Sequence, residues 1–169
     1  MMLEVVELDE QCSIPEIGGD EHVPMMIRWG LTTGVIWRAN FQNGQICCEL
    51  KVASVGGRVY GFTILNPPPV STGLEESTGT WEEAGVPIVS LKNFDLNPDL
   101  VPQQKLVEVS CSPKAVRHGK WLETQFGDNP IERWAMSGDV GFGIDETDRL
   151  VAVRVPTDSL PPSSVLAIK

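Results

Sequence analysis

Three runs of alternating apolar and polar residues, separated by turn sequences, occupy residues 35–65. The first run, residues 35–41, places its apolar side chains on one face of an extended chain. Asn43-Gly44 follows and predicts a two-residue hairpin of type I′, since both central residues of that turn need positive φ. The second run, residues 46–52, turns at Gly56-Gly57 into the third, residues 59–65. This stretch therefore predicts three consecutive antiparallel strands.

Weaker alternation elsewhere predicts further short strands. The 16 glycines and 13 prolines of the 169 residues also favour many turns and short strands over long helices. The additional strands are expected at residues 3–8, 25–31, 105–111, 140–144 and 150–155. The first of these is acidic and is expected at a sheet edge, where charge discourages aggregation.

Two short helices are also expected. Asn129 followed by Pro130, with Gly138 beyond the end, has the spacing of a helix over residues 130–136. Pro113 is expected to open a second helix that ends near His118 or continues to Phe126.

These patterns together predict a mainly β protein of α+β type with one or two short helices. Its antiparallel meander would form a twisted sheet, a sandwich or a partly open barrel. A length of 169 residues suits one domain over residues 1–169. Loops are expected near residues 66–80 and 93–104, where proline and small polar residues gather, and an extended tail over 156–169.

The cellular compartment is inferred from the search for membrane-spanning and signal segments and from the cysteines. No run approaches the roughly 20 apolar residues that span a bilayer, and no basic region followed by an apolar one marks a secretory signal. The cysteines are Cys12, Cys47, Cys48 and Cys111, and the adjacent pair points to opposite faces of a strand. We therefore expect reduced thiols, a cytoplasmic protein and no membrane partner.

Negative charge is concentrated in two parts of the chain. The net charge is −10 at pH 7; residues 1–27 carry −7 and residues 59–104 carry −5, whereas residues 28–58 carry +3. Such a field repels nucleic acid and attracts basic proteins. The acidity has two interpretations: it keeps the protein soluble, or it steers a basic partner to a binding surface.

Motifs for catalysis and cofactor binding are missing from the sequence. It contains no metal-ligand spacing, no G-x-S-x-G elbow and no phosphate-binding glycine loop, so we expect no metal and no cofactor. Thiol–imidazole pairs remain conceivable for Cys111 with His118 and for Cys12 with His22. Carboxylate pairs such as Glu82 with Glu83 are the remaining acid–base option. An enzyme or small-molecule binder of β-barrel type would use these carboxylates and His118.

Aromatic side chains suggest two kinds of surface. Trp29, Trp37, Tyr60 and Phe62 could form a stacking platform for bases, but they lie on faces that must also build the core, and the charge opposes phosphate. We therefore expect no nucleic-acid partner. Trp81 and Trp121 stand in polar contexts, and an exposed aromatic beside charge is typical of an interface.

The sequence thus favours a non-catalytic interaction domain that binds a basic protein. Acidic inhibitors and immunity-type proteins that neutralise basic toxin nucleases share this composition. The acids of residues 1–21 are expected to contribute to binding the partner. The other residues expected to bind it are one tryptophan with the acids around it and acids in the following loop: Glu75, Glu76, Trp81, Glu82, Glu83, Asp95 and Asp99.

Overall fold

The computed structural model describes residues 2–11, 14–30, 36–73, 81–95, 97, 99, 106–162, 164 and 166, with the side chain of Ile46 excepted. Within these residues the protein is built from β-strands, and the one helical element is a short 3₁₀ turn, η2 (Thr157–Ser159). The predicted mainly β class is confirmed. In the described part of the chain, no helix is long and apolar enough to cross a membrane.

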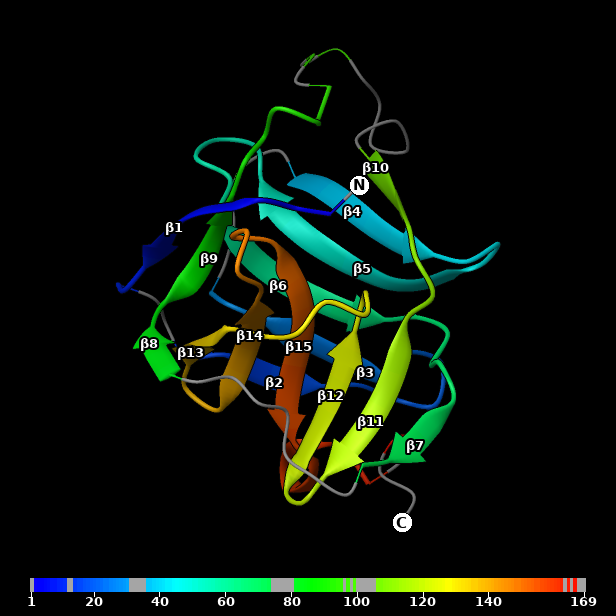
Figure 1. Ribbon diagram of the computed structural model, residues 1–169. Coiled ribbons are helices and arrows are strands. Elements are labelled where there is room, and N and C mark those ends of the chain that lie inside the picture. Colours follow the sequence, from blue (N-terminus) through cyan, green and yellow to red (C-terminus); the bar gives the residue numbers. More distant parts are fainter. Residues whose placement is uncertain are drawn as a thin grey trace.

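Two large sheets and one small sheet make up the fold (Figure 1). The six-stranded sheet has the order β10-β4-β5-β6-β3-β2. Its strands are β2 (Glu16–Gly18), β3 (Met25–Arg28), β4 (Ile36–Gln42), β5 (Ile46–Ala53), β6 (Val59–Ile64) and β10 (Leu106–Ser110). The seven-stranded sheet has the order β7-β11-β12-β15-β14-β13-β8. Its strands are β7 (Val70–Thr72), β8 (Trp81–Ala84), β11 (Lys114–His118), β12 (Trp121–Gln125), β13 (Arg133–Ser137), β14 (Val140–Ile144) and β15 (Leu150–Pro156).

The small sheet pairs β1 (Val5–Asp9) with β9 (Val86–Val89). None of the three sheets closes into a barrel. The two large sheets are mixed rather than purely antiparallel, because β10, β7 and β8 each join their neighbour in parallel. These parallel pairs lie at sheet edges, and each connects segments distant in sequence, which alternation alone does not reveal.

The predicted meander is confirmed: β4, β5 and β6 pair antiparallel in sequence order. The turn between β4 and β5 differs from the prediction. Gln42 pairs with Ile46, so three residues form the loop, and a register shift lies beside it. Gly44 has φ +73°, whereas Asn43 does not have positive φ, so the loop is not a type I′ turn.

Both predicted helices are wrong. Residues 114–118 form β11 and residues 133–137 form β13. In β11 the buried Ala115 lies between the exposed Lys114 and the half-buried Val116, and each of its residues pairs with β12. Proline supplies no backbone donor and therefore precedes a strand as readily as it opens a helix. Pairing with neighbouring strands determines the structure of these segments.

The loop and tail predictions also need correction. β7 lies inside the predicted loop 66–80, because Val70–Thr72 pairs with β11. The tail after Pro156 does not simply extend over the surface: Leu160, Ser164 and Leu166 are buried. The Ser164 hydroxyl donates to the carbonyl of Pro24 over 2.5 Å, and Arg117 Nη2 donates to the carbonyl of Leu166 over 2.6 Å. The tail therefore closes over the end of the core.

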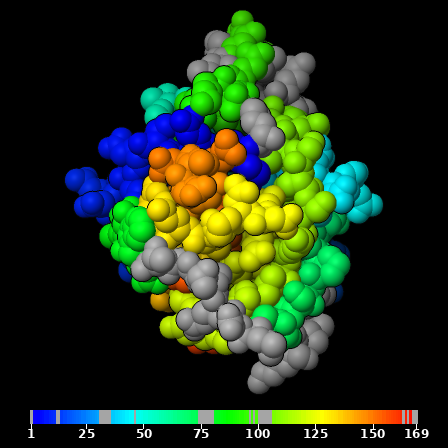
Figure 2. Space-filling view, viewed as in Figure 1, coloured from blue at the N-terminus to red at the C-terminus, as the bar shows by residue number. Residues whose placement is uncertain are grey.

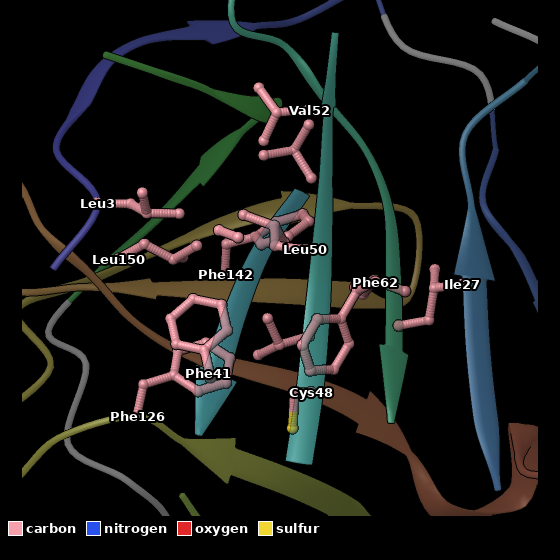
Figure 3. Packing of buried hydrophobic residues seen from close by; sticks show 14 of the residues in the cluster. Leu3, Ile27, Phe41, Cys48, Leu50, Val52, Phe62, Phe126, Phe142 and Leu150 are labelled. Carbon is pink, nitrogen blue, oxygen red and sulfur yellow. The ribbon is translucent and has the colours of Figure 1, made fainter. Parts of the chain in front are cut away.

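The core lies between the two large sheets and includes residues from Leu3 to Leu166. Phe126, which follows β12, stacks on Phe41 of β4 with ring centroids 4.0 Å apart and meets Phe62 of β6 edge-on at 5.8 Å. Trp29 packs on Phe142 of β14 at 5.2 Å. Figure 3 shows the four phenylalanine rings pointing into a shared interior with Leu50 and Leu150. Aromatic contacts thus join the two sheets.

The turn between β14 and β15 is organised by a buried carboxylate, Asp145. Its Oδ1 accepts from the backbone N–H groups of Thr147 (2.9 Å) and Arg149 (3.0 Å) and from the Thr147 hydroxyl. Its Oδ2 accepts from Asn129 over 2.6 Å. Burial alone would raise the pKa of Asp145, but the hydrogen bonds outweigh that effect and lower the pKa below its usual value.

This lowered pKa predicts a loss of stability in acid. A depressed folded-state pKa stabilises the fold above the unfolded pKa of about 3.9, and the contribution disappears as the pH falls through the folded value. The Asp145→Asn variant should therefore unfold more easily at pH 7 by about 1–3 kcal/mol. Urea titrations at pH 7 and pH 2.5 should show this difference shrinking in acid, while the exposed Asp139→Asn control matches wild type. A difference that stays constant with pH would contradict the assignment.

Candidate protein-interaction site

The acidic N-terminal segment forms β1, which pairs antiparallel with β9 from Val5–Val89 to Asp9–Val86. The predicted acidic strand at residues 3–8 is thus confirmed within one or two residues. A register shift lies between Val5 and Glu7. This irregularity breaks the alternation, so Val6 and Glu7 are both exposed, Val6 to 58%. The bulge therefore presents an apolar and an acidic side chain side by side.

Gly85 connects β8 to β9 and allows β1 to approach. It has φ +139°, and a Cβ at this position would lie 3.0 Å from the Cβ of Leu8. Because β9 pairs with β1 while β8 ends the seven-stranded sheet, the N-terminal acids are brought next to the Trp81–Glu83 sequence. In Figure 2 the two segments are neighbours, β8 in green below the blue N-terminal strand.

A groove of about 250 Å³ lies between these elements. The aliphatic side chains of β1 form the floor of this groove, and β1 also contributes Glu7. Further carboxylates come from β8 and from the turn before β15. We call this the acidic groove, and its lining residues are Val5, Val6, Glu7, Leu8, Glu83, Arg133 and Asp148. It combines apolar surface with acids from three separate parts of the sequence.

The charge of the acidic groove is unbalanced. Arg133 is mostly buried and faces three carboxylates: Glu83 Oε2 at 3.5 Å, Glu132 Oε2 at 3.8 Å and Asp148 Oδ1 at 2.5 Å. Within the groove lining, the one positive charge of Arg133 therefore stands against the negative charges of Glu7, Glu83 and Asp148, and Glu132 adds a fourth beside it. The surplus attracts a cationic side chain, and the aliphatic floor suits the carbon chain of lysine or arginine.

The opposite face of β8 is fixed by a different contact. Glu82 accepts a hydrogen bond from the guanidinium of Arg154, which is 8% exposed. That guanidinium lies 4.5 Å from the ring centre of Trp121 and 4.0 Å from that of Trp134. Cation–π contacts on both sides hold the arginine in place. Glu82 therefore forms a structural ion pair on the face of β8 opposite the groove, although its side chain is 61% exposed.

Trp81 is the exposed aromatic of this edge. Its side chain is 45% exposed, and its Nε1 donates to Glu83 Oε1 over 3.0 Å. The hydrogen bond holds the indole beside the groove carboxylate. The polar contexts of Trp81 and Trp121 suggested that one of them is partly exposed, and this is confirmed. Trp81 is exposed, and Trp121 is half-buried beneath the guanidinium of Arg154.

The residues expected to bind a partner do not form one patch. Glu83 lines the groove with Trp81 beside it, while Glu82 turns to the other face. Asp95 and Asp99 are exposed in the stretch after β9, which projects at the top of Figure 2, and they do not line the groove. Asp95 instead accepts from the backbone of Asn97. Glu75 and Glu76 lie outside the described residues.

Val6, Arg133 and Asp148 were not selected as partner-binding residues from the sequence. Glu7 was selected through its charge, as one of the acids of residues 1–21. Asp148 has φ +58°, alone among described non-glycine residues, and nothing in the sequence relates its turn to β1. The groove depends on the β-bridge between Glu4 and Arg149 and on the register of β1 with β9. Both are tertiary contacts between segments that are distant in the sequence.

The carboxylate-and-histidine site is not assembled by the described residues. His118 lies on β11 and the Glu82–Glu83 pair on β8, with four strands between them in the sheet. Neither ring nitrogen of His118 has a hydrogen-bond partner, so none of the described thiols pairs with it. Burial raises the pKa of the half-buried Cys111 thiol, which favours its neutral form. The Cys12–His22 pair falls partly outside the described residues.

Two further ligand classes were tested against the geometry. The four aromatics considered as a base-stacking platform, Trp29, Trp37, Tyr60 and Phe62, are all buried, so they form no exposed surface. Among the described histidine, cysteine, aspartate and glutamate side chains, no group of three could hold a metal ion.

No protein-family model matches the chain, and no curated protein matches it significantly.

Proposed function

We propose that this chain is a non-catalytic, cytoplasmic protein-interaction domain that binds a basic partner through the acidic groove and Trp81. The observation that carries the proposal is the convergence of β1, β8 and the β14–β15 turn on one groove with surplus negative charge. An acidic inhibitor or immunity-type protein that neutralises a basic toxin nuclease would use such a surface.

The physical argument assigns a role to each part. The charge surplus of the groove and the net charge of −10 accelerate encounter with a positive surface. The aliphatic floor and the exposed indole then remove apolar area from water, which slows dissociation. Arg133 holds the carboxylates in place without neutralising them. A lysine or arginine of the partner would enter between Glu83, Asp148 and Glu7.

The test compares two variants that each remove three negative charges. The groove variant carries Glu7→Gln, Glu83→Gln and Asp148→Asn; the control variant carries Glu21→Gln, Asp139→Asn and Asp158→Asn at exposed sites outside the groove. Asparagine at position 148 tolerates the positive φ. For a basic protein captured from the source cells, the groove variant should bind about tenfold or more weakly.

The control variant should bind like wild type, because only the position of the removed charges differs. Thermal denaturation verifies that both variants fold. Equal loss of affinity in both variants would show that net charge, rather than the groove, determines binding. Full affinity in the groove variant would contradict the proposal.

A further inference from the structure

The edge of β8 next to the groove has one strand neighbour. β8 ends the order of the seven-stranded sheet and pairs with β13 on one side. Within the described residues, no strand pairs with its other side. As far as the described residues show, the backbone N–H and C=O groups on that side have no strand partner, as at any sheet edge.

The side chains on the two faces of β8 make different contacts. Trp81 and Glu83 share one face and are joined by their hydrogen bond, on the same side as the groove. Glu82 lies on the other face and is held by Arg154 between two tryptophans. The strand is thus anchored through Glu82 on one face, while Trp81 (45% exposed) and the side chain of Glu83 (43% exposed) lie on the other.

We propose that an extended, basic segment of a partner protein adds to β8 as an extra strand, with lysine or arginine at alternate positions facing Trp81 and Glu83. This inference rests on the proposed function and specifies how the partner binds. Charge complementarity identifies the occupant, because Glu83 lies with Trp81 on the face of β8 that alternate side chains of an added strand would share, and the other carboxylates of the acidic groove extend this negative surface. Backbone hydrogen bonds supply affinity, and the alternate basic side chains supply specificity.

The same acids disfavour a second copy of this chain as the occupant of the edge. Glu82 and Glu83 would face like charges in a second β8, which is unfavourable for direct cross-strand neighbours. Acids on a short edge strand deter self-association and still admit a strand of opposite charge.

The test uses a synthetic nine-residue peptide of alternating lysine and threonine, with both ends blocked. Its analogue has every second backbone nitrogen methylated, which keeps all charges and removes the donors on one edge. The unmethylated peptide should bind at least about tenfold more tightly, and it should slow hydrogen exchange of amides in residues 81–84. Amides of β2, at the edge of the other large sheet, serve as the internal reference and should not change.

The outcomes separate the two proposals. Equal binding of both peptides, abolished by the groove variant but not by the control variant, would overturn strand addition and leave the groove as the binding site. Binding of neither peptide, or binding that ignores the groove charges, would overturn both. Protection that appears in β2 rather than β8 would also overturn the assignment of the edge.

Discussion

Replacing Phe126 with alanine is expected to lower the free energy of unfolding by about 3–5 kcal/mol. Phe126 is fully buried, stacks on Phe41 and meets Phe62, so it fills space between the two large sheets. Its removal leaves a cavity that the rigid sheets cannot close. Urea denaturation followed by tryptophan fluorescence measures the change.

An exposed aliphatic residue provides the control. Val70 is 45% exposed on β7, and Val70→Ala should change stability by less than about 0.5 kcal/mol. Because natural domains have only about 5–15 kcal/mol of stability, the Phe126 variant should be partly unfolded at physiological temperature. A loss below about 1 kcal/mol would mean that Phe126 does not join the sheets.

The Gly57→Ala substitution is expected to be the next most damaging change. Gly57 has φ +73°, and its added Cβ would lie 2.1 Å from the carbonyl oxygen of Val89. Left-handed backbone costs alanine about 1–2 kcal/mol, and displacing β9 adds about 1–3 kcal/mol. The carbonyl of Gly57 also accepts a hydrogen bond from the Val89 N–H over 2.9 Å. Displacing Val89 therefore disturbs β9, the strand that pairs with β1. Reduced stability and a distorted groove should therefore appear together.

A variant of the neighbouring Gly56 separates the cost of the left-handed backbone from the cost of displacing β9. Gly56 has φ +82°, but nothing lies within 4 Å of an added Cβ. Gly56→Ala should cost only the backbone term of about 1–2 kcal/mol and should leave β9 in place. Equal losses for the two variants in denaturation experiments would show that Val89 does not press on Gly57.

Local alternation predicted most of the strands because burial of one face imposes a period of two. It succeeded for β4, β5, β6, β14 and β15, which pair with strands close in the sequence. It failed at β11, where Pro113 suggested a helix and the segment Lys114–His118 lacks a regular alternation of apolar and polar residues. The parallel edges were not predictable, since each connects strands separated by more than 40 residues.

Only some of the residues that form the acidic groove, and not their arrangement, could be predicted from the sequence. The charge of the N-terminus and the Trp81–Glu83 sequence were visible, and both contribute to it. Their meeting depends on the pairing of β1 with β9, roughly 80 residues away, and on the close approach at Gly85. Asp95 was selected on charge alone, and its carboxylate instead stabilises a turn. Charge in a sequence indicates the kind of partner, whereas strand register determines which charges face it.

The most direct test of the account is the association rate constant of the captured basic partner, measured by stopped flow between 20 and about 300 mM salt. Wild type and the control variant should associate rapidly at low salt and slow steeply as salt increases. The groove variant should be about tenfold slower at low salt and should lose most of its salt dependence. The account would be contradicted if the groove variant and the control variant had the same rate and the same salt dependence.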